Sequence, residues 1–227
     1  MARLWQLVPL HQAVKPALLP VRLLILAFLA SGAASAADRA GDFDFYVLSL
    51  TWSPSYCDNA RRPDPRQCNL DIPGFVVHGL WPQYERGYPE YCDSSFPRRL
   101  PSSTISGIAD VIPSPGAAQY QWEKHGICSG LRPQSYFSLV RQAARKVVIP
   151  KPYLDVRSDI QSQARAIEGD FIAANPGMSD RGIAISCDRD GVIEVRICLT
   201  KRLDFRRCEE VDRRSCRLPK IELPAVD

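Results

Sequence analysis

The stretch DFDFYVLSLTW, Asp42 to Trp52, predicts the first strand of the fold. Polar and apolar residues alternate along it, and it is rich in aromatic and β-branched side chains, which is typical of a β-strand. GFVVHGLW, Gly74 to Trp81, indicates a second strand that ends at Pro82. Near the other end of the chain, GIAISCDRDGVIEVRICL contains two further β-like runs around Asp190-Gly191, a dipeptide typical of hairpin turns.

Helical patterns fill the middle of the chain. Ser114-Pro115 indicates a helix start, with serine as the cap and proline in the first turn, and this helix is expected to run through Lys124. A longer amphipathic helix is predicted over Gln134 to Val148. Ser158 and Gln161 resemble a capping box that opens a further helix. That helix is expected to turn four side chains inward: Ile160, Ala164, Ile167 and Phe171.

The order of these elements predicts the fold class. Strands at both ends with helices between them, without β-α-β alternation, are typical of α+β proteins. We therefore expect a central, mainly antiparallel sheet with helices packed on it, in one domain stapled by disulfides.

Residues 1–36 are predicted to be a secretory signal peptide. Three basic side chains precede the apolar run LLILAFLA, and the small-residue site Ala34-Ser35-Ala36 follows it. The run is shorter than the roughly 20 residues that span a bilayer, which disfavours an uncleaved anchor. The chain's formal net charge is +4, so removing three positive charges leaves residues 37–227 near +1. This domain lacks a general electrostatic footprint for nucleic acid, and anion binding must be local.

All eight cysteines lie in the predicted mature domain, and an even count in an exported protein indicates four disulfides. Eight cysteines permit about a hundred pairings, so spacing leaves the connectivity open. There is no Cys-x-x-Cys pair, and His78 and His125 are the only histidines after residue 36. These are too few for the usual zinc patterns, so neither a metal nor a cofactor is expected.

QYQWEKHGIC, Gln119 to Cys128, places Lys124 next to His125, with Gln121 one helical turn earlier. Residues three and four apart share a helix face, so amide, ammonium and imidazole form one cluster, with Tyr120 beside Lys124. Such a cluster suits phosphoryl chemistry, because an ammonium stabilises negative charge and a neutral imidazole takes a proton. Lys124 also favours the neutral form of His125. A solvated helix face with a chance histidine is the alternative interpretation.

His78 stands at the end of the second predicted strand, followed by Gly79 and then Trp81. Strand ends are common places for catalytic groups. Gly79 allows a ligand to approach closely, and Trp81 offers a flat face on which a base can stack. If both histidines face one cleft, they supply an acid and a base. The alternative is a core histidine, with Trp81 as plain packing.

HGLWP, residues 78–82, together with WEKHG-x-C, residues 122–128, resembles the two motifs of the ribonuclease T2 family. YVLSLTWSPSYC, residues 46–57, resembles the first strand of that family, and the similarity covers roughly Phe43 to Cys216. The resemblance implies an α+β fold around an antiparallel sheet, and metal-independent cleavage of single-stranded RNA without a cofactor.

The resemblance also implies roles for individual residues. His78 matches the histidine of the first motif and would be the general acid, and His125 matches the last histidine of the second motif and would be the general base. Lys124 would stabilise the phosphate in the transition state, and Trp81 would help to hold a base. Gln83 stands at a position that is often acidic in the family and linked to base preference.

Two neighbouring residues depart from the family pattern. The family commonly has His-Glu where this chain has Tyr120-Gln121, so its phosphate-binding histidine maps onto Tyr120 and its acidic residue onto Gln121. An amide can donate a neutral hydrogen bond to a phosphate oxygen, which an ionised carboxylate cannot. We therefore expect Gln121 to contribute to catalysis without exchanging protons.

The resemblance further implies the disulfide pairing. The implied pairs are Cys57 with Cys68, Cys92 with Cys128, Cys187 with Cys216, and Cys198 with Cys208. The second pair would tie the catalytic helix to the loop after the His78 strand.

The predicted protein is an exported bacterial endoribonuclease, in the periplasm or the medium. It would act as a monomer on single-stranded RNA, leave DNA intact, and leave the membrane once residues 1–36 are removed. The main alternative is a catalytically weak or inactive relative that acts as an extracellular RNA-binding, storage or interaction protein. A disulfide-stapled interaction domain with structural histidines, and a Cys-His protease, are weaker alternatives.

Overall fold

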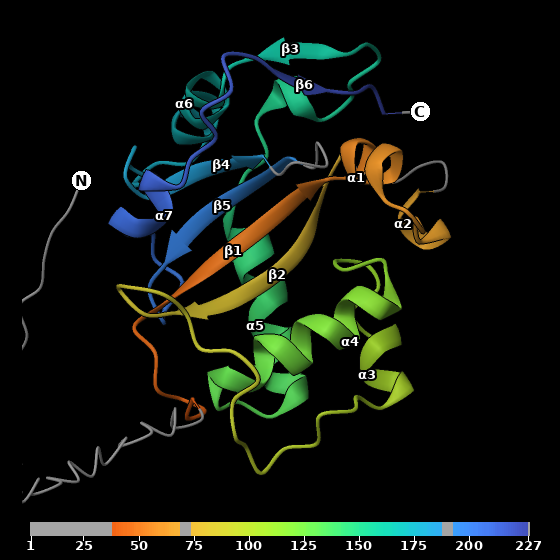
Figure 1. Cartoon of the computed structure of the whole chain (residues 1–227), viewed down its shortest axis with the longest axis vertical. Helices are drawn as coiled ribbons and strands as arrows, with labels where there is room; N and C mark the ends of the chain where they lie inside the picture. The colour runs from red at the N-terminus through yellow and green to blue at the C-terminus, as the bar shows by residue number, and fades with distance from the viewer. Residues whose placement is uncertain (1–37, 69–73, 188–192, 227) are drawn as a thin grey trace, which may run out of the picture. The chain divides into compact units, whose positions relative to one another are not determined.

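The computed structural model describes residues 38–68, 74–187 and 193–226. A four-stranded antiparallel sheet lies at its centre, with strand order β2-β1-β5-β4. The strands are β1 (Phe45–Trp52), β2 (Phe75–Gln83), β4 (Ile183–Cys187) and β5 (Ile193–Leu199). Figure 1 shows how β1 lies between β2 and the C-terminal strand β5. The predicted α+β class with an antiparallel sheet is confirmed, while the turn predicted at 190–191 lies outside the described residues.

Every residue of β1 is buried, because both faces of the sheet are covered at this strand. Leu48, Leu50 and Trp52 point into the main hydrophobic core. Phe45 and Val47 point to the opposite face, where they pack in a smaller cluster. Successive side chains of β1 therefore alternate between two faces of the sheet, and both faces are covered. The face of Phe45 and Val47 carries the site described below.

Two long helices follow the predicted boundaries. They are α4 (Pro115–Lys124) and α5 (Pro133–Lys146). Figure 1 shows α5 behind β1 and β2, and the Tyr136 hydroxyl of α5 donates a hydrogen bond to the Leu80 carbonyl of β2 at 2.8 Å. The shorter helical elements are α1 (Ser53–Asn59), α2 (Pro65–Cys68), α3 (Ser102–Ser106), η1 (Gly126–Ser129), η2 (Lys151–Tyr153) and α7 (Glu209–Arg213).

The helix predicted to open at Ser158 begins later, so that prediction was wrong at its start. Residues Ile160–Ser162 instead form β3, which pairs antiparallel with β6 (Ile221–Leu223). This pairing with the C-terminal segment satisfies backbone groups that a helix would otherwise use. Helix α6 spans Ala164–Ala174 and buries three of the predicted side chains: Ala164, Ile167 and Phe171.

Strand β2 continues through Pro82 to Gln83, two residues beyond the predicted last residue, Trp81. Because β2 is the edge strand of the sheet, the missing amide hydrogen of Pro82 interrupts no ladder. Across all three described segments, none of the helices combines the length and apolar character required to cross a bilayer.

The four implied disulfides are confirmed. They join Cys57 to Cys68, Cys92 to Cys128, Cys187 to Cys216, and Cys198 to Cys208. Two of these matter for the site. The Cys92–Cys128 bridge fixes the loop after β2 to the residues just after α4, and the Cys198–Cys208 bridge fixes β5 to the start of α7.

Candidate active site

A β-bulge turns His78 away from the core. The pairing of β1 with β2 shifts between Ser49 and Leu50, and His78 is the extra residue. The flanking Val77 and Leu80 both pack in the core although they are three residues apart, so the two-residue period of the strand is broken between them. Without the shift, His78 would share the face of Leu80. The interpretation of His78 as a core histidine is therefore wrong.

His78 meets a buried carboxylate on the other side of β1. Its Nδ1 lies 2.5 Å from Oε1 of Glu194, whose side chain is 10% exposed. Nη2 of Arg196 lies 2.8 Å from the other oxygen, Oε2. Burial raises the pKa of Glu194, but the hydrogen bond and charge of His78, with the charge of Arg196, outweigh it and lower this pKa to about 2. The ionised carboxylate can only accept, so Nδ1 of His78 is the donor.

Glu194 and Arg196 were not predicted as site residues. Strict alternation in IEVRI, residues 193–197, places these two charged side chains on one face of β5, opposite three buried apolar ones. Charged side chains in the central part of a sheet need partners, and that signal points to a site. The partner on β2 was not visible from the sequence, because it depends on the pairing of three strands.

Helix α4 positions the second half of the site. The Ser114 hydroxyl accepts the Ala117 amide hydrogen at 3.1 Å, which confirms the predicted cap. The helix ends at Lys124, and His125 leaves it with φ −119° and ψ −50°. The His125 amide still donates to the Gln121 carbonyl at 3.1 Å, so the two residues lie one turn apart, as predicted.

The His125 imidazole is enclosed and only 7% of the residue is exposed. Its ring centroid lies 5.2 Å from that of Trp81 and 5.9 Å from that of Tyr88. Burial, and then the charges of Lys124 and His78, lower the pKa of His125 to about 3. Within the described part of the chain, its Nδ1 is buried without a hydrogen-bond partner. The ring is thus held neutral near pH 7, in line with the prediction made from Lys124 alone.

Gln121 is 1% exposed, lies against Trp81, and lines neither of the two hollows described below. Its Oε1 accepts a hydrogen bond from Trp81 Nε1 at 2.6 Å. An indole nitrogen is only a donor, so this contact orients the amide, with Oε1 towards Trp81 and the donor atom Nε2 at the other end of the amide. A Cβ at Gly79 would stand 2.4 Å from Trp81 Nε1 and 2.5 Å from Gln121 Oε1. Gly79 therefore makes room for this contact.

Lys124 and Tyr120 lie together at the surface. Lys124 Nζ is 5.8 Å from the centroid of the Tyr120 ring and 3.5 Å from a carboxylate oxygen of Glu90. Burial lowers the pKa of Lys124, but the phenols of Tyr120 and Tyr88, with Glu90, raise it overall. Glu123 points elsewhere and accepts from Gln119 at 2.7 Å. The structure thus places Tyr120 beside Lys124, and Lys124 with His125 along one hollow, whereas Gln121 contacts Trp81.

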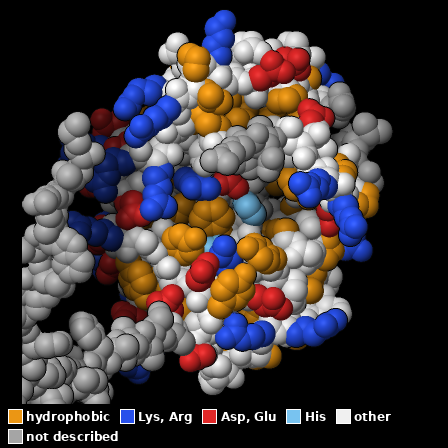
Figure 2. Space-filling model, in the orientation of Figure 1, with side chains coloured by type: hydrophobic (Ala, Val, Ile, Leu, Met, Phe, Trp, Pro, Cys, Tyr) orange, Lys and Arg blue, Asp and Glu red, His pale blue; other side chains and the backbone are white. Residues whose placement is uncertain are grey.

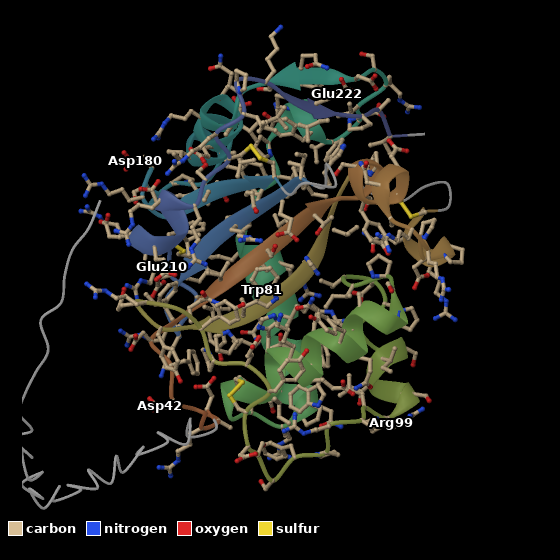
Figure 3. All side chains as sticks on the ribbon, viewed as in Figure 1. Asp42, Trp81, Arg99, Asp180, Glu210 and Glu222 are labelled. Carbon is tan, nitrogen blue, oxygen red and sulfur yellow. A yellow bond between two sulfur atoms is a disulfide. The ribbon has the colours of Figure 1, made fainter. Side chains whose placement is uncertain are left out.

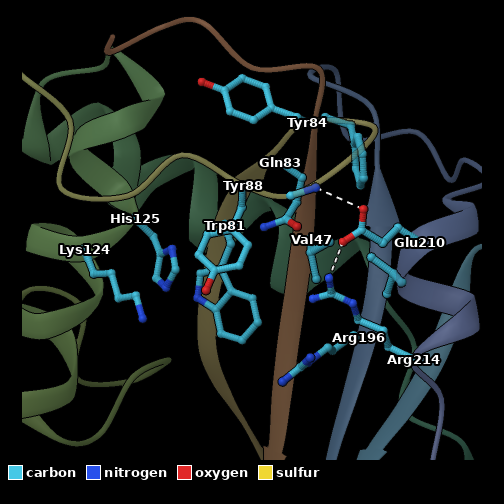
Figure 4. A pocket seen from close by; sticks show the side chains of 13 residues that line it. Val47, Trp81, Gln83, Tyr84, Tyr88, Lys124, His125, Arg196, Glu210 and Arg214 are labelled. Carbon is cyan, nitrogen blue, oxygen red and sulfur yellow. Dashed lines mark hydrogen bonds and ion pairs between the residues drawn. The ribbon is translucent and has the colours of Figure 1, made fainter. Parts of the chain in front are cut away.

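Two hollows flank these residues. One, of about 240 Å³, is lined by Trp81, Gln83, Tyr88, Lys124, His125 and Arg196 among others. In Figure 4, Lys124 and His125 lie on one side of it, Trp81 and Tyr88 stand in the middle, and Arg196 lies beyond them. Glu210 forms the far wall, accepts a hydrogen bond from the Gly87 amide at 3.0 Å and forms an ion pair with Arg214 at 2.5 Å.

The second hollow, of about 450 Å³, is lined by His78 and Glu194 with Thr51, Tyr56, Asn59 and Arg61 among others. The two histidines thus open onto neighbouring hollows, and both contact Trp81: the His78 and Trp81 centroids lie 5.5 Å apart. Figure 3 shows Trp81 over the β1–β2 pair. Figure 2 shows histidine side chains near the middle of this face, among apolar and basic ones.

In the three segments that the structure describes, no group of three or more His, Cys, Asp or Glu side chains is arranged to hold a metal ion. The hydrogen-bond donors that converge here are imidazole, ammonium, guanidinium, amide and phenol, while the carboxylates of Glu194 and Glu210 are paired with Arg196 and Arg214. Such donors suit an anionic ligand with a planar ring system.

These features define an α+β domain with a polar, histidine-containing site. A sequence model of the Ribonuclease T2 family matches residues 43–208, and the chain belongs to that family. The family predicted from the two motifs is therefore confirmed.

Among relatives, "Ribonuclease" of Aeromonas hydrophila is 41% identical over 124 residues, 54% of this chain and 55% of the relative. "Ribonuclease I" of Escherichia coli strain K12 is 29% identical, and the match covers 53% of this chain and 60% of the relative. The chain thus spans little more than half of these relatives.

Solved structures share the fold. An RNase-related protein from Calystegia sepium has a TM-score of 0.63 at 22% identity, covering 82% of this chain and 98% of that one. RNase NT, solved in complex with 5′-AMP, has a TM-score of 0.51 at 27% identity, covering 74% of this chain and 91% of that one.

Proposed function

We propose that this chain is an exported endoribonuclease that cleaves single-stranded RNA without a metal ion. The ribose 2′-hydroxyl attacks the adjacent phosphorus, and the products carry first a 2′,3′-cyclic phosphate and then a 3′-phosphate. One observation carries the proposal: His78 and His125 both contact Trp81, with Lys124 next to His125. Ribonuclease names among the relatives support it.

His125 acts as the general base. With its pKa lowered to about 3, its imidazole is neutral at working pH and can accept the proton of the 2′-hydroxyl. The negative charge of a phosphate bound beside it raises this basicity in the complex. As the proton moves to His125, the bond from O2′ to phosphorus forms.

His78 acts as the general acid. It gives its Nε2 proton to the 5′-oxygen as the bond from phosphorus to that oxygen breaks. In the hydrolysis step the roles reverse: His78 takes a proton from the attacking water, the bond from phosphorus to O2′ breaks, and His125 returns its proton to O2′. Lys124 stabilises the charge that develops on the non-bridging oxygens. The amide hydrogens of Gln121, whose oxygen already bonds Trp81, are expected to support this set of donors.

The hollow beside His125 is the proposed base site. Trp81 and Tyr88 offer aromatic faces, and stacking on such a face contributes roughly 1–3 kcal/mol per base. Gln83 lines the same hollow and Tyr120 lies beside Lys124, so both remain proposed substrate contacts. The complex of RNase NT with 5′-AMP supports a nucleotide ligand.

Export is proposed on two grounds. Residues 1–36 have the pattern of a signal peptide, and four disulfides are typical of an oxidising compartment such as the periplasm or the medium. The mature protein is proposed to be a monomer that leaves DNA intact, since DNA lacks the 2′-hydroxyl.

The test is incubation of the purified chain with a defined RNA in EDTA, followed by mapping of the cleavage positions and termini. The expected result is cleavage with 2′,3′-cyclic phosphate ends, and none where a 2′-deoxynucleotide occupies the scissile position. Activity that disappears in EDTA and returns with added metal would contradict the mechanism. Binding of RNA without cleavage would instead support the non-catalytic alternative.

A further inference from the structure

Glu194 is a buried carboxylate whose two oxygens are both engaged. Oε1 lies 2.5 Å from Nδ1 of His78, and Oε2 receives two hydrogen bonds from Arg196, at 2.8 Å from Nη2 and 3.1 Å from Nε. A carboxylate in such a place is costly to bury unless it is fully paired. The pairing here is complete, and it is directed at the group proposed to be the general acid.

The three strands explain how Glu194 reaches His78. Thr51 on β1 pairs with Glu194 on one side and with Val76 on the other, and Ser49 pairs with Arg196 and Gly79 in the same way. His78 and Glu194 are therefore two strands apart on one face, with only small β1 side chains between them. Strands lie about 4.8 Å apart, so the two long side chains can meet above β1.

From this geometry we infer that Glu194 is a positioning residue for His78, and that Arg196 orients the carboxylate. The inference rests on the proposed function. An ionised carboxylate accepts only, so it keeps a proton on Nδ1 and leaves Nε2 to face the substrate. After Nε2 has protonated the leaving oxygen, the Nδ1–H remains bonded to Glu194. Nε2 is then ready to take a proton from water in the hydrolysis step.

Arg196 gives the pair a second anchor. Its guanidinium carbon lies 5.4 Å from the Trp81 ring centroid, and it lines the hollow of His125 while Glu194 lines that of His78. Nε and Nη2 of Arg196 both donate to Oε2, and this planar pair of donors fixes the rotation of the carboxylate. A lysine ammonium on a flexible side chain would not fix it in this way. Glu194 and Arg196 thus connect the acid to the wall of the proposed base site.

The test compares two substrates that differ in their need for an acid. One is a dinucleotide RNA, whose leaving 5′-oxygen must be protonated, and the other is uridine 3′-(4-nitrophenyl phosphate), whose nitrophenolate leaves without help. Glu194→Gln is expected to slow the dinucleotide by about 10- to 100-fold, mainly in kcat, and the aryl ester by less than about threefold. The titratable and charged groups around His78 are otherwise unchanged: Arg196 on β5, Tyr56 and Arg61 near α1, and His125 after α4.

A matched control separates positioning from stability. Glu168→Gln removes another buried carboxylate, which is 3% exposed and accepts from the Ile185 amide and the Ser215 hydroxyl far from the histidines in the chain. It should leave both rates within about twofold at a temperature where each variant is folded. If Glu194→Gln fails to fold, Glu194→Asp keeps the charge but withdraws it by one carbon–carbon bond, about 1.5 Å, and should show the same substrate selectivity.

Imidazole nitrogen NMR gives a readout that does not depend on activity. Wild-type His78 should show a proton on Nδ1 in its neutral form, and Glu194→Gln should mix the two tautomers. Equal slowing of both substrates, or no slowing of either, would overturn the inference while the proposed function stands. A wild-type chain that cleaves neither substrate would instead overturn the proposed function.

Discussion

His78 and His125 are supported in opposite ways. His78 belongs to the sheet, is partly open to solvent, and donates to an ionised carboxylate that Arg196 holds in place. His125 follows the end of a helix, is almost fully enclosed, and has no partner for Nδ1 within the described residues. A paired carboxylate holds Nδ1–H of His78 in place, while burial and Lys124 lower the pKa of His125.

This difference in surroundings fits the proposal that one side-chain type supplies both an acid and a base. Pairs of titratable groups take separate roles when their surroundings favour different protonation states. Here the sheet provides the surroundings of the proposed acid and the helix end provides those of the proposed base. Trp81 contacts both rings, so the two halves meet at one side chain.

The largest expected effect comes from removing either histidine. His78→Ala and His125→Ala should each slow cleavage of a dinucleotide RNA by about 10²- to 10⁴-fold, because each removes one proton transfer. The comparison predicts that the aryl ester restores much of the rate in His78→Ala and none of it in His125→Ala. Single-turnover rates measure both. Equal behaviour of the two variants on the aryl ester would contradict the assignment of acid and base.

Removing the cation of the helix half should have the next largest effect. Lys124→Ala is expected to slow both substrates by about 10²- to 10³-fold, because both pass through the same charged phosphorus centre. Lys146→Ala is a matched control: Lys146 Nζ lies 5.7 Å from the Phe205 ring, much as Lys124 lies over Tyr120, but outside both hollows. The test compares initial rates of the two variants at saturating substrate. Near-native activity of Lys124→Ala would show that Lys124 has no part in the mechanism.

Gln121→Ala is expected to slow cleavage by about 10- to 100-fold, less than loss of a strong oxyanion donor. The loss combines a missing amide donor with a Trp81 ring released from its hydrogen bond. Gln121→Glu should be milder, because a carboxylate still accepts from Trp81, and it should add an acidic step to the pH–rate profile that the wild type lacks. Full activity of Gln121→Ala would show that the residue is only a neighbour of the chemistry.

Short sequence patterns correctly predicted those helices and strands that depend mainly on interactions between neighbouring residues. The capped helix up to Lys124 and the strand pattern from residue 42 to residue 52 follow from caps, periodicity and residue type. The sequence also identified His78 and His125, because each lies in a short segment whose residues are distinctive. The disulfide pairing came from the family resemblance, because spacing alone allows many pairings.

Features that depend on pairing between distant segments were not predicted. The bulge at His78 exists only because β1 aligns with β2 in a shifted register, and the contact with Glu194 spans three strands. The helix expected from Ser158 lost its first turn to a strand pair with residues 221–223, about 60 residues later. The family position of Gln121 suggested a phosphate contact, whereas its bond to Trp81 depends on the room left by Gly79.

The smallest expected effect concerns stability in acid, and it tests the two supports separately. The folded-state pKa of His125 is lowered from 6.5 to about 3, and that of Glu194 from 4.5 to about 2. In both cases the folded state binds fewer protons than the unfolded state, so stability is lost as pH falls. His125 contributes this loss between about pH 6.5 and 3, and Glu194 contributes it between about pH 4.5 and 2.

Denaturant unfolding at a series of pH values should therefore show different slopes in two variants. Between pH 6.5 and 4.5, the free energy of unfolding should fall less steeply with falling pH in His125→Asn than in the wild type, by at most about 1.4 kcal/mol per pH unit. In Glu194→Gln the slope over this interval should equal that of the wild type. Below pH 4.5 the slope should flatten in Glu194→Gln as well. Equal slopes in the wild type and His125→Asn above pH 4.5 would mean that His125 is not held neutral by burial. The base half of the comparison would then need another explanation, whereas the paired carboxylate of the acid half would be unaffected.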